Sequence, residues 1–78
     1  MREKRAYHVI TFQTTTEAMA MEKFCERKHL SGRMIPVPRE ISAGCGLAWR
    51  VSSEEFPEWL KRVSETSLRY EKVTELMM

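Results

Sequence analysis

The first segment of the chain is rich in β-branched and aromatic residues, and after it the apolar residues recur at helical spacing. Residues Arg5–Gln13 are rich in β-branched and aromatic side chains, which predicts a strand. In the following residues, 14–30, Ala18, Met21 and Cys25 recur at the spacing of one helix face. The chain is therefore predicted to begin with a strand followed by a helix.

The ends of this predicted helix carry typical boundary residues. Thr15 or Thr16 can cap its first turn, because a threonine hydroxyl accepts a hydrogen bond from a free backbone N–H group. Lys28 and His29 suit its last turn, where cations complement the helix dipole. Gly32 follows and is expected to stop the helix.

Two further strands are expected in the middle of the chain. Residues Arg33–Pro38 form a short apolar segment whose two prolines predict an edge strand. In Leu47–Val51 the side chains alternate between two faces, one of which carries Leu47, Trp49 and Val51. The loop between these strands contains most of the glycines of the chain.

The C-terminal part is predicted to form a second helix and a fourth strand. Residues Ser52–Ser67 begin with serines that can cap a helix, and they place Phe56, Leu60 and Val63 on one stripe. Residues Arg69–Met77 are predicted to form the closing strand.

The predicted order is strand, helix, strand, strand, helix, strand. The simplest fold for such a chain is an α+β, ferredoxin-like βαββαβ two-layer sandwich, with both helices on one face of an antiparallel sheet. The other face is expected to carry Tyr7, Val9, Met34 and Ala48. Such a face is apolar enough to predict a partner surface or a homodimer.

Length and charge narrow the functional classes. The 78 residues are expected to form one domain, residues 1–78, with a small core. The formal net charge of +2 is too small, and the basic residues are too scattered, to predict nucleic-acid binding. No apolar run is long enough to predict a membrane span, and the basic start lacks the apolar stretch of a signal peptide. We therefore expect a cytoplasmic protein.

Cys45 is the strongest candidate for chemistry. It stands between Gly44 and Gly46, in the loop that joins the second and third predicted strands. Glycines leave the sulfur accessible and allow successive backbone N–H groups to form an anion-binding nest, which favours the reactive thiolate. Arg39, at the other end of the loop, is expected to fold back and add positive charge. The alternative is that the glycines only shape a tight connection.

Cys25 has a simpler interpretation. It lies on the apolar face of the first predicted helix, where a free cysteine acts as a small hydrophobic side chain. Two alternatives stay open: a resolving thiol for Cys45, and a zinc ligand together with His8, His29 and Cys45. The chain has no Cys-x-x-Cys pair and no nucleotide-binding glycine motif, so we expect no metal and no cofactor.

Two segments, "YHVITFQTTTEAMAMEK" and "GRMIPVPREISAGCGLAWRV", carry a family resemblance. Over nearly its whole length the chain resembles the selenium/sulfur carrier protein-like family of small bacterial and archaeal domains. The resemblance implies a carrier whose loop cysteine holds sulfur or selenium as a persulfide or selenopersulfide. That cysteine corresponds to Cys45, and the neighbouring motif residues correspond to Arg39, Ser42 and Gly46.

The resemblance also implies partners, namely a cysteine desulfurase, a selenocysteine lyase or a selenophosphate synthetase. We therefore expect a carrier rather than a turnover enzyme, in which Cys45 accepts the chalcogen. The supporting loop residues are expected to be Arg39, Ser42, Gly44 and Gly46. Two other functions stay open: an interaction or dimerisation module with a structural Cys45, and a thiol redox switch that uses Cys45 with Cys25.

Overall fold

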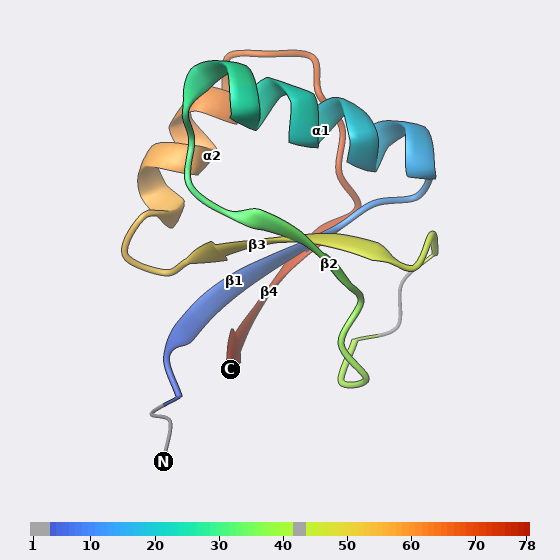
Figure 1. Ribbon diagram of the computed structural model, residues 1–78, viewed down its shortest axis with the longest axis vertical. Coiled ribbons are helices and arrows are strands. Elements are labelled where there is room, and N and C mark those ends of the chain that lie inside the picture. The colour runs from blue at the N-terminus through green and yellow to red at the C-terminus, as the bar shows by residue number, and fades with distance from the viewer. Residues whose placement is uncertain (1–3, 42–43) are drawn as a thin grey trace.

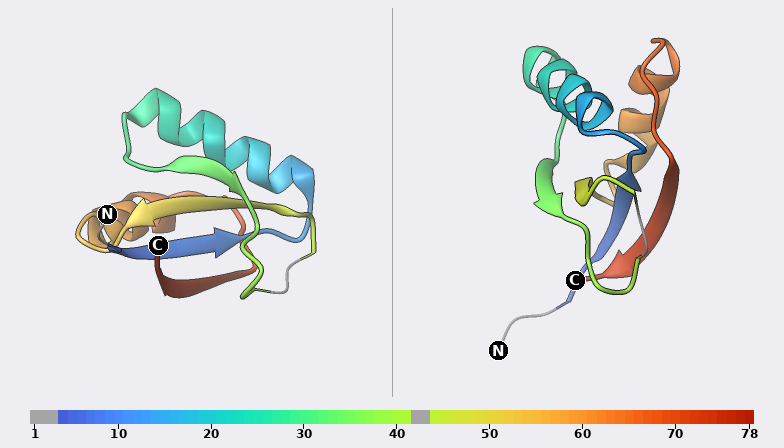
Figure 2. Two further views of the ribbon diagram at one scale, coloured as in Figure 1. Left: turned by 60° about the horizontal axis from the view of Figure 1, so that its bottom comes forward. Right: turned by 90° about the vertical axis from the view of Figure 1, so that its right-hand side faces the viewer.

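The computed structural model describes residues 4–41 and 44–78 and places both helices on one face of a four-stranded antiparallel sheet (Figures 1 and 2). The strand order is β2-β3-β1-β4. This arrangement confirms the predicted α+β, ferredoxin-like sandwich and the edge position of the second strand. The elements in chain order are β1 (Ala6–Thr11), α1 (Thr15–Lys28), β2 (Arg33–Pro36), β3 (Leu47–Ser52), α2 (Phe56–Ser64) and β4 (Lys72–Met77).

The core lies between the helices and the sheet. Trp59 and Trp49 are its largest side chains, with exposed fractions of 1% and 3%. Aromatic and aliphatic burial on this scale is the main stabilising contribution in a domain of this size. The other buried members of this cluster are Ile10, Phe12, Ala18, Met21, Phe24, Cys25, Val51 and Val63.

The N-cap of helix α1 lies one residue before the two predicted cap positions. Thr14, rather than Thr15 or Thr16, is the N-cap, and its hydroxyl accepts a hydrogen bond from Glu17 N at 3.1 Å. The Glu17 carboxylate in turn accepts a hydrogen bond from Gln13 N at 3.2 Å. This reciprocal pair satisfies backbone donors that a helix leaves free at its start.

The C-cap of the same helix is His29, and the predicted stop at Gly32 lies three residues further along the chain. His29 adopts the left-handed conformation with φ of 55°, and its N–H group donates to the carbonyls of Cys25 and Glu26. Gly32 has a different role: its φ is +123°, and an added Cβ would collide with the Trp49 indole and lie 2.6 Å from the Arg50 carbonyl oxygen. Gly32 therefore allows the chain entering β2 to pass against Trp49.

Helix α2 is shorter than predicted. Glu55 is its N-cap, and the Ser52 hydroxyl donates to the Glu55 carboxylate at 3.0 Å instead of capping the helix. The prediction for Leu60 was also wrong, because Leu60 is exposed and Trp59 occupies the core. The closing strand, β4, begins at Lys72 rather than Arg69.

The sheet face opposite the helices has its own small apolar cluster. Val9 and Ala48 are fully buried there because Ile41, from the loop after β2, packs over them. Met34 was expected on this face but lies on the other, since it pairs with Trp49 and packs against the main core. Its neighbour Ile35 pairs with Ala48 and takes the expected place. The apolar centre of the face is thus covered by the chain itself.

Within residues 4–41 and 44–78, neither helix has the length and apolar character needed to cross a bilayer.

Candidate functional site

The loop between β2 and β3 is attached to the sheet at two points. Val37 N donates to Gly46 O at 3.0 Å, which closes the base of the loop. Beyond it, Ile41 N donates to Pro38 O at 3.0 Å, and the Ile41 side chain is buried against the sheet. Ser42, one of the predicted loop residues, lies outside the described part of the chain.

Cys45 is a free, half-buried cysteine at the β3 end of this loop. Its side chain packs against the main core, on the helix side of the sheet. The thiol donates a hydrogen bond to the carbonyl oxygen of Leu47, with a distance of 3.6 Å between sulfur and oxygen. The sulfur is thus partly sheltered by the core and partly accessible to a reagent.

The two glycines beside Cys45 have different structural roles. Gly46 has φ of +82°, a conformation that residues with a Cβ rarely adopt, and an added Cβ would meet no atom within 4 Å. At Gly44 an added Cβ would lie 3.5 Å from Gln13 O, which is an ordinary contact. Only Gly46 therefore requires glycine for its backbone conformation. Gly44 shows instead that the cysteine segment lies beside the end of β1, next to the start of α1.

Arg39 lies on the other side of the sheet from the Cys45 side chain. It is exposed in the turn 38–41, whose Ile41 packs on the face opposite the helices, whereas Cys45 packs toward the helices. Figure 1 shows this turn below the sheet and residues 44–46 at the start of β3. Within the described ranges Arg39 forms no ion pair or hydrogen bond. The structure does not bring Arg39 and Cys45 together, and a supporting role for Arg39 stays a prediction.

Cys25 is a core residue, as its position on the helix predicted. It is 1% exposed, and burial raises the pKa of its thiol to about 11, with the neighbouring Trp59 indole partly opposing the rise. A thiol in this state is protonated at neutral pH and is a poor nucleophile.

The two cysteines lie toward opposite ends of α1. The Cys45 segment contacts Gln13, just before the helix, whereas Cys25 lies ten residues beyond Thr15, about 15 Å along the axis. A disulfide requires Cα atoms within about 7 Å, so this placement argues against a redox switch that joins the two. Both cysteines are free in the structure.

The residues of the rival zinc site lie in separate places. His8, on β1, stacks against Phe56 with 3.9 Å between ring centroids, and its Nδ1 lies 2.9 Å from the Ser53 hydroxyl oxygen. His29 ends α1, and Cys45 lies in the β2–β3 loop. Across the part of the chain that the structure describes, no three histidine, cysteine or acidic residues are arranged to hold a metal ion.

Two features of the site were missed by sequence reasoning. The first is that Ile41 anchors the loop. The sequence indicates this position, because Ile41 is a single β-branched apolar residue among polar and small neighbours. The hydrogen bond from Cys45 to the Leu47 carbonyl had no signal, because it depends on the backbone path through Gly46.

A known protein family matches most of the chain. The family model described as "Putative Se/S carrier protein-like" matches residues 7–75, which include both helices, the whole β2–β3 loop and Cys45. No curated protein and no solved structure gives a significant match.

Proposed function

Since the chain belongs to the Se/S carrier protein-like family, we propose that it carries sulfur or selenium as a persulfide or selenopersulfide on Cys45. The observation that carries this proposal is the contrast between the two cysteines. Cys45 is half-buried on a loop at the end of the sheet, whereas Cys25 is enclosed in the core with a raised pKa. A carrier requires one accessible thiol and no second catalytic group.

Loading follows the chemistry of thiol–disulfide exchange. The Cys45 thiolate attacks the outer sulfur of a persulfide R–S–SH on a donor, and a new S–S bond forms to Cys45. The S–S bond of the donor breaks, and the donor leaves as the thiolate R–S⁻. The proton that Cys45 loses is taken up by solvent or by the departing thiolate, so the transfer needs no oxidant or reductant.

The hydrogen bond to Leu47 affects this step directly. A thiolate cannot donate, so the contact between Cys45 Sγ and the Leu47 carbonyl oxygen is lost when the nucleophile forms. An added Cβ at Gly46 would meet no atom within 4 Å, so the loop has room to adjust at this residue. The packing of Cys45 against the core then shelters one side of the bound chalcogen from solvent.

The partners proposed for this carrier handle activated sulfur or selenium. A cysteine desulfurase or a selenocysteine lyase would supply the chalcogen, and a selenophosphate synthetase would be a receiving enzyme. One cysteine can carry either element, so the donor enzyme decides which of the two is loaded.

The test is a transfer assay with matched cysteine variants. The protein is incubated with a cysteine desulfurase and cysteine, separated from the enzyme, and assayed for sulfur released by a thiol reductant. The wild type and Cys25→Ala should carry comparable sulfur, and Cys45→Ser should carry none. Transfer to Cys45→Ser, or equal loss in both variants, would refute the carrier role of Cys45.

A further inference from the structure

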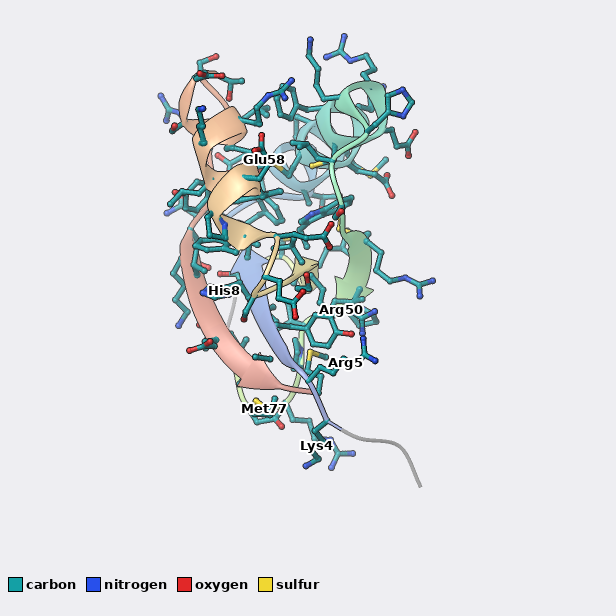
Figure 3. The ribbon with its side chains drawn as sticks, turned by 90° about the vertical axis from the view of Figure 1, so that its left-hand side faces the viewer. Lys4, Arg5, His8, Arg50, Glu58 and Met77 are labelled. Carbon is teal, nitrogen blue, oxygen red and sulfur yellow. The ribbon has the colours of Figure 1, made fainter. Side chains whose placement is uncertain are left out.

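A basic groove lies at the end of the sheet opposite Cys45. It has a volume of about 810 Å³ and is formed where the start of β1 and the end of β3 meet the start of β2. Its cations are Lys4, Arg5, Arg33 and Arg50. Figure 3 shows this end of the molecule, with Lys4, Arg5 and Arg50 labelled.

Two arginines stand side by side in this groove. Arg33 and Arg50 are directly paired across β2 and β3, on the sheet face opposite the helices. Like charges in directly opposed positions destabilise a sheet unless another group neutralises them. In the described ranges neither guanidinium forms an ion pair or a hydrogen bond to a protein acceptor. Among the described residues no carboxylate neutralises this pair, so an anion from outside the chain can supply the missing negative charge.

Arg50 is also held in position. Its guanidinium carbon lies 4.5 Å from the centre of the Tyr7 ring, a cation–π arrangement. A guanidinium fixed in this way loses less side-chain entropy when it binds a ligand, and its remaining donors match the paired oxygens of a phosphate.

The carboxylates of the groove limit the shape of the ligand. Glu55 accepts hydrogen bonds from the hydroxyls of Ser31 and Ser52, one on each oxygen, and Glu54 is exposed beside it. The four cations exceed these two acids, so the groove has a net positive charge. A long acidic peptide crossing the groove would pass both carboxylates, whereas a compact anion need not. The arrangement favours a compact anion.

We propose that the groove formed by Arg33, Arg50 and their neighbours is a second ligand site that binds a compact anion with two linked phosphate groups. The site is separate from the proposed carrier function: Cys45 precedes β3, whereas Ser52 at the groove ends it, a separation of about 20 Å along an extended strand. The anion therefore does not contact the thiol.

The test is calorimetric titration of the full chain with pyrophosphate at low ionic strength. Pyrophosphate should bind more tightly than orthophosphate, and Arg33→Gln and Arg50→Gln should each weaken its binding at least about tenfold, as expected for loss of a charge-assisted contact. The control is Arg27→Gln on the exposed side of α1, which changes net charge equally and should leave the dissociation constant unchanged.

Four results would overturn this proposal. They are absence of pyrophosphate binding, an equal effect of Arg27→Gln, citrate binding as tightly as pyrophosphate, and a glutamate-rich peptide binding more tightly than either. Arg33 is exposed on the edge strand, so Arg33→Gln should keep the wild-type melting temperature. A loss of sulfur loading by Cys45→Ser has no bearing on this titration, so the two proposals fail independently.

Discussion

In the folded protein, Cys25 should react with an alkylating reagent far more slowly than an accessible cysteine with an ordinary pKa. Burial raises the pKa of its thiol from 9.0 to about 11, which lowers the thiolate fraction at neutral or mildly basic pH about 100-fold. Because the thiolate is the nucleophile, the reaction slows by at least this factor. Enclosure of the sulfur, which is 1% exposed, slows it further, since the reagent must wait for the core to open.

The assay is a time course with iodoacetamide at about pH 8, read by peptide mass spectrometry. Cys25 should react at least about 100 times more slowly in the native chain than in urea, whereas Cys45, which is half-buried, should be modified in the native chain long before Cys25. Comparable native and unfolded rates at Cys25 would contradict the burial argument and reopen a role for this thiol.

The same raised pKa links stability to pH. The folded chain holds the Cys25 proton more tightly than the unfolded chain, so this contribution is complete below about pH 9 and is lost as pH rises toward 11. The loss should reach about 3 kcal/mol in the free energy of unfolding. Urea titrations at several pH values between 9 and 11 give the free energy of unfolding as a function of pH. This free energy should fall more steeply with pH for the wild type than for Cys25→Ala, and equal dependence on pH in the two proteins would refute the linkage.

Substitutions at three glycines and at His29 test the backbone of the fold and of the site. Gly32→Ala should lower the free energy of unfolding by about 3 kcal/mol, because its Cβ collides with Trp49 and its φ is positive; a melting temperature within a few degrees of wild type would contradict this. Gly46→Ala should lower the free energy of unfolding by about 1 kcal/mol because the φ of this residue is positive. Gly44→Ala should change it by no more than about 0.5 kcal/mol. Equal losses for the two variants in urea unfolding would be inconsistent with the assigned conformations. His29→Gly should stabilise the chain by about 0.5 kcal/mol by relieving the left-handed helix end, and a lower melting temperature would count against it.

The order of elements was predictable because each segment has a clear period, but the register of β2 was not. β2 has only four residues and ends at a proline, so too few alternating positions fix which side chains face the helices. A shift of one residue exchanges the two faces, and this is why Met34 rather than Ile35 was assigned to the open face.

A similar ambiguity affected α2. Leu60 and Trp59 are adjacent on the helix, and both lie near the apolar stripe defined by Phe56 and Val63. Spacing does not decide between them. The larger indole fills the space over the sheet, and Leu60 remains exposed.

The site was predicted in part. The position of Cys45 on the β2–β3 loop follows from the strand assignments alone. The path of the loop does not, because it depends on Ile41 packing against Val9 and Ala48, contacts between residues that are distant in the sequence. This packing carries the turn with Arg39 to the face opposite the helices, which local sequence reasoning could not anticipate.

The most direct test of the carrier proposal is site-resolved mass spectrometry of the chain after incubation with a persulfide donor. The proposal predicts one added sulfur on the peptide that contains Cys45, lost on treatment with a thiol reductant, and no addition on the peptide that contains Cys25. An unmodified Cys45, with the donor shown to be active on another thiol, would contradict it.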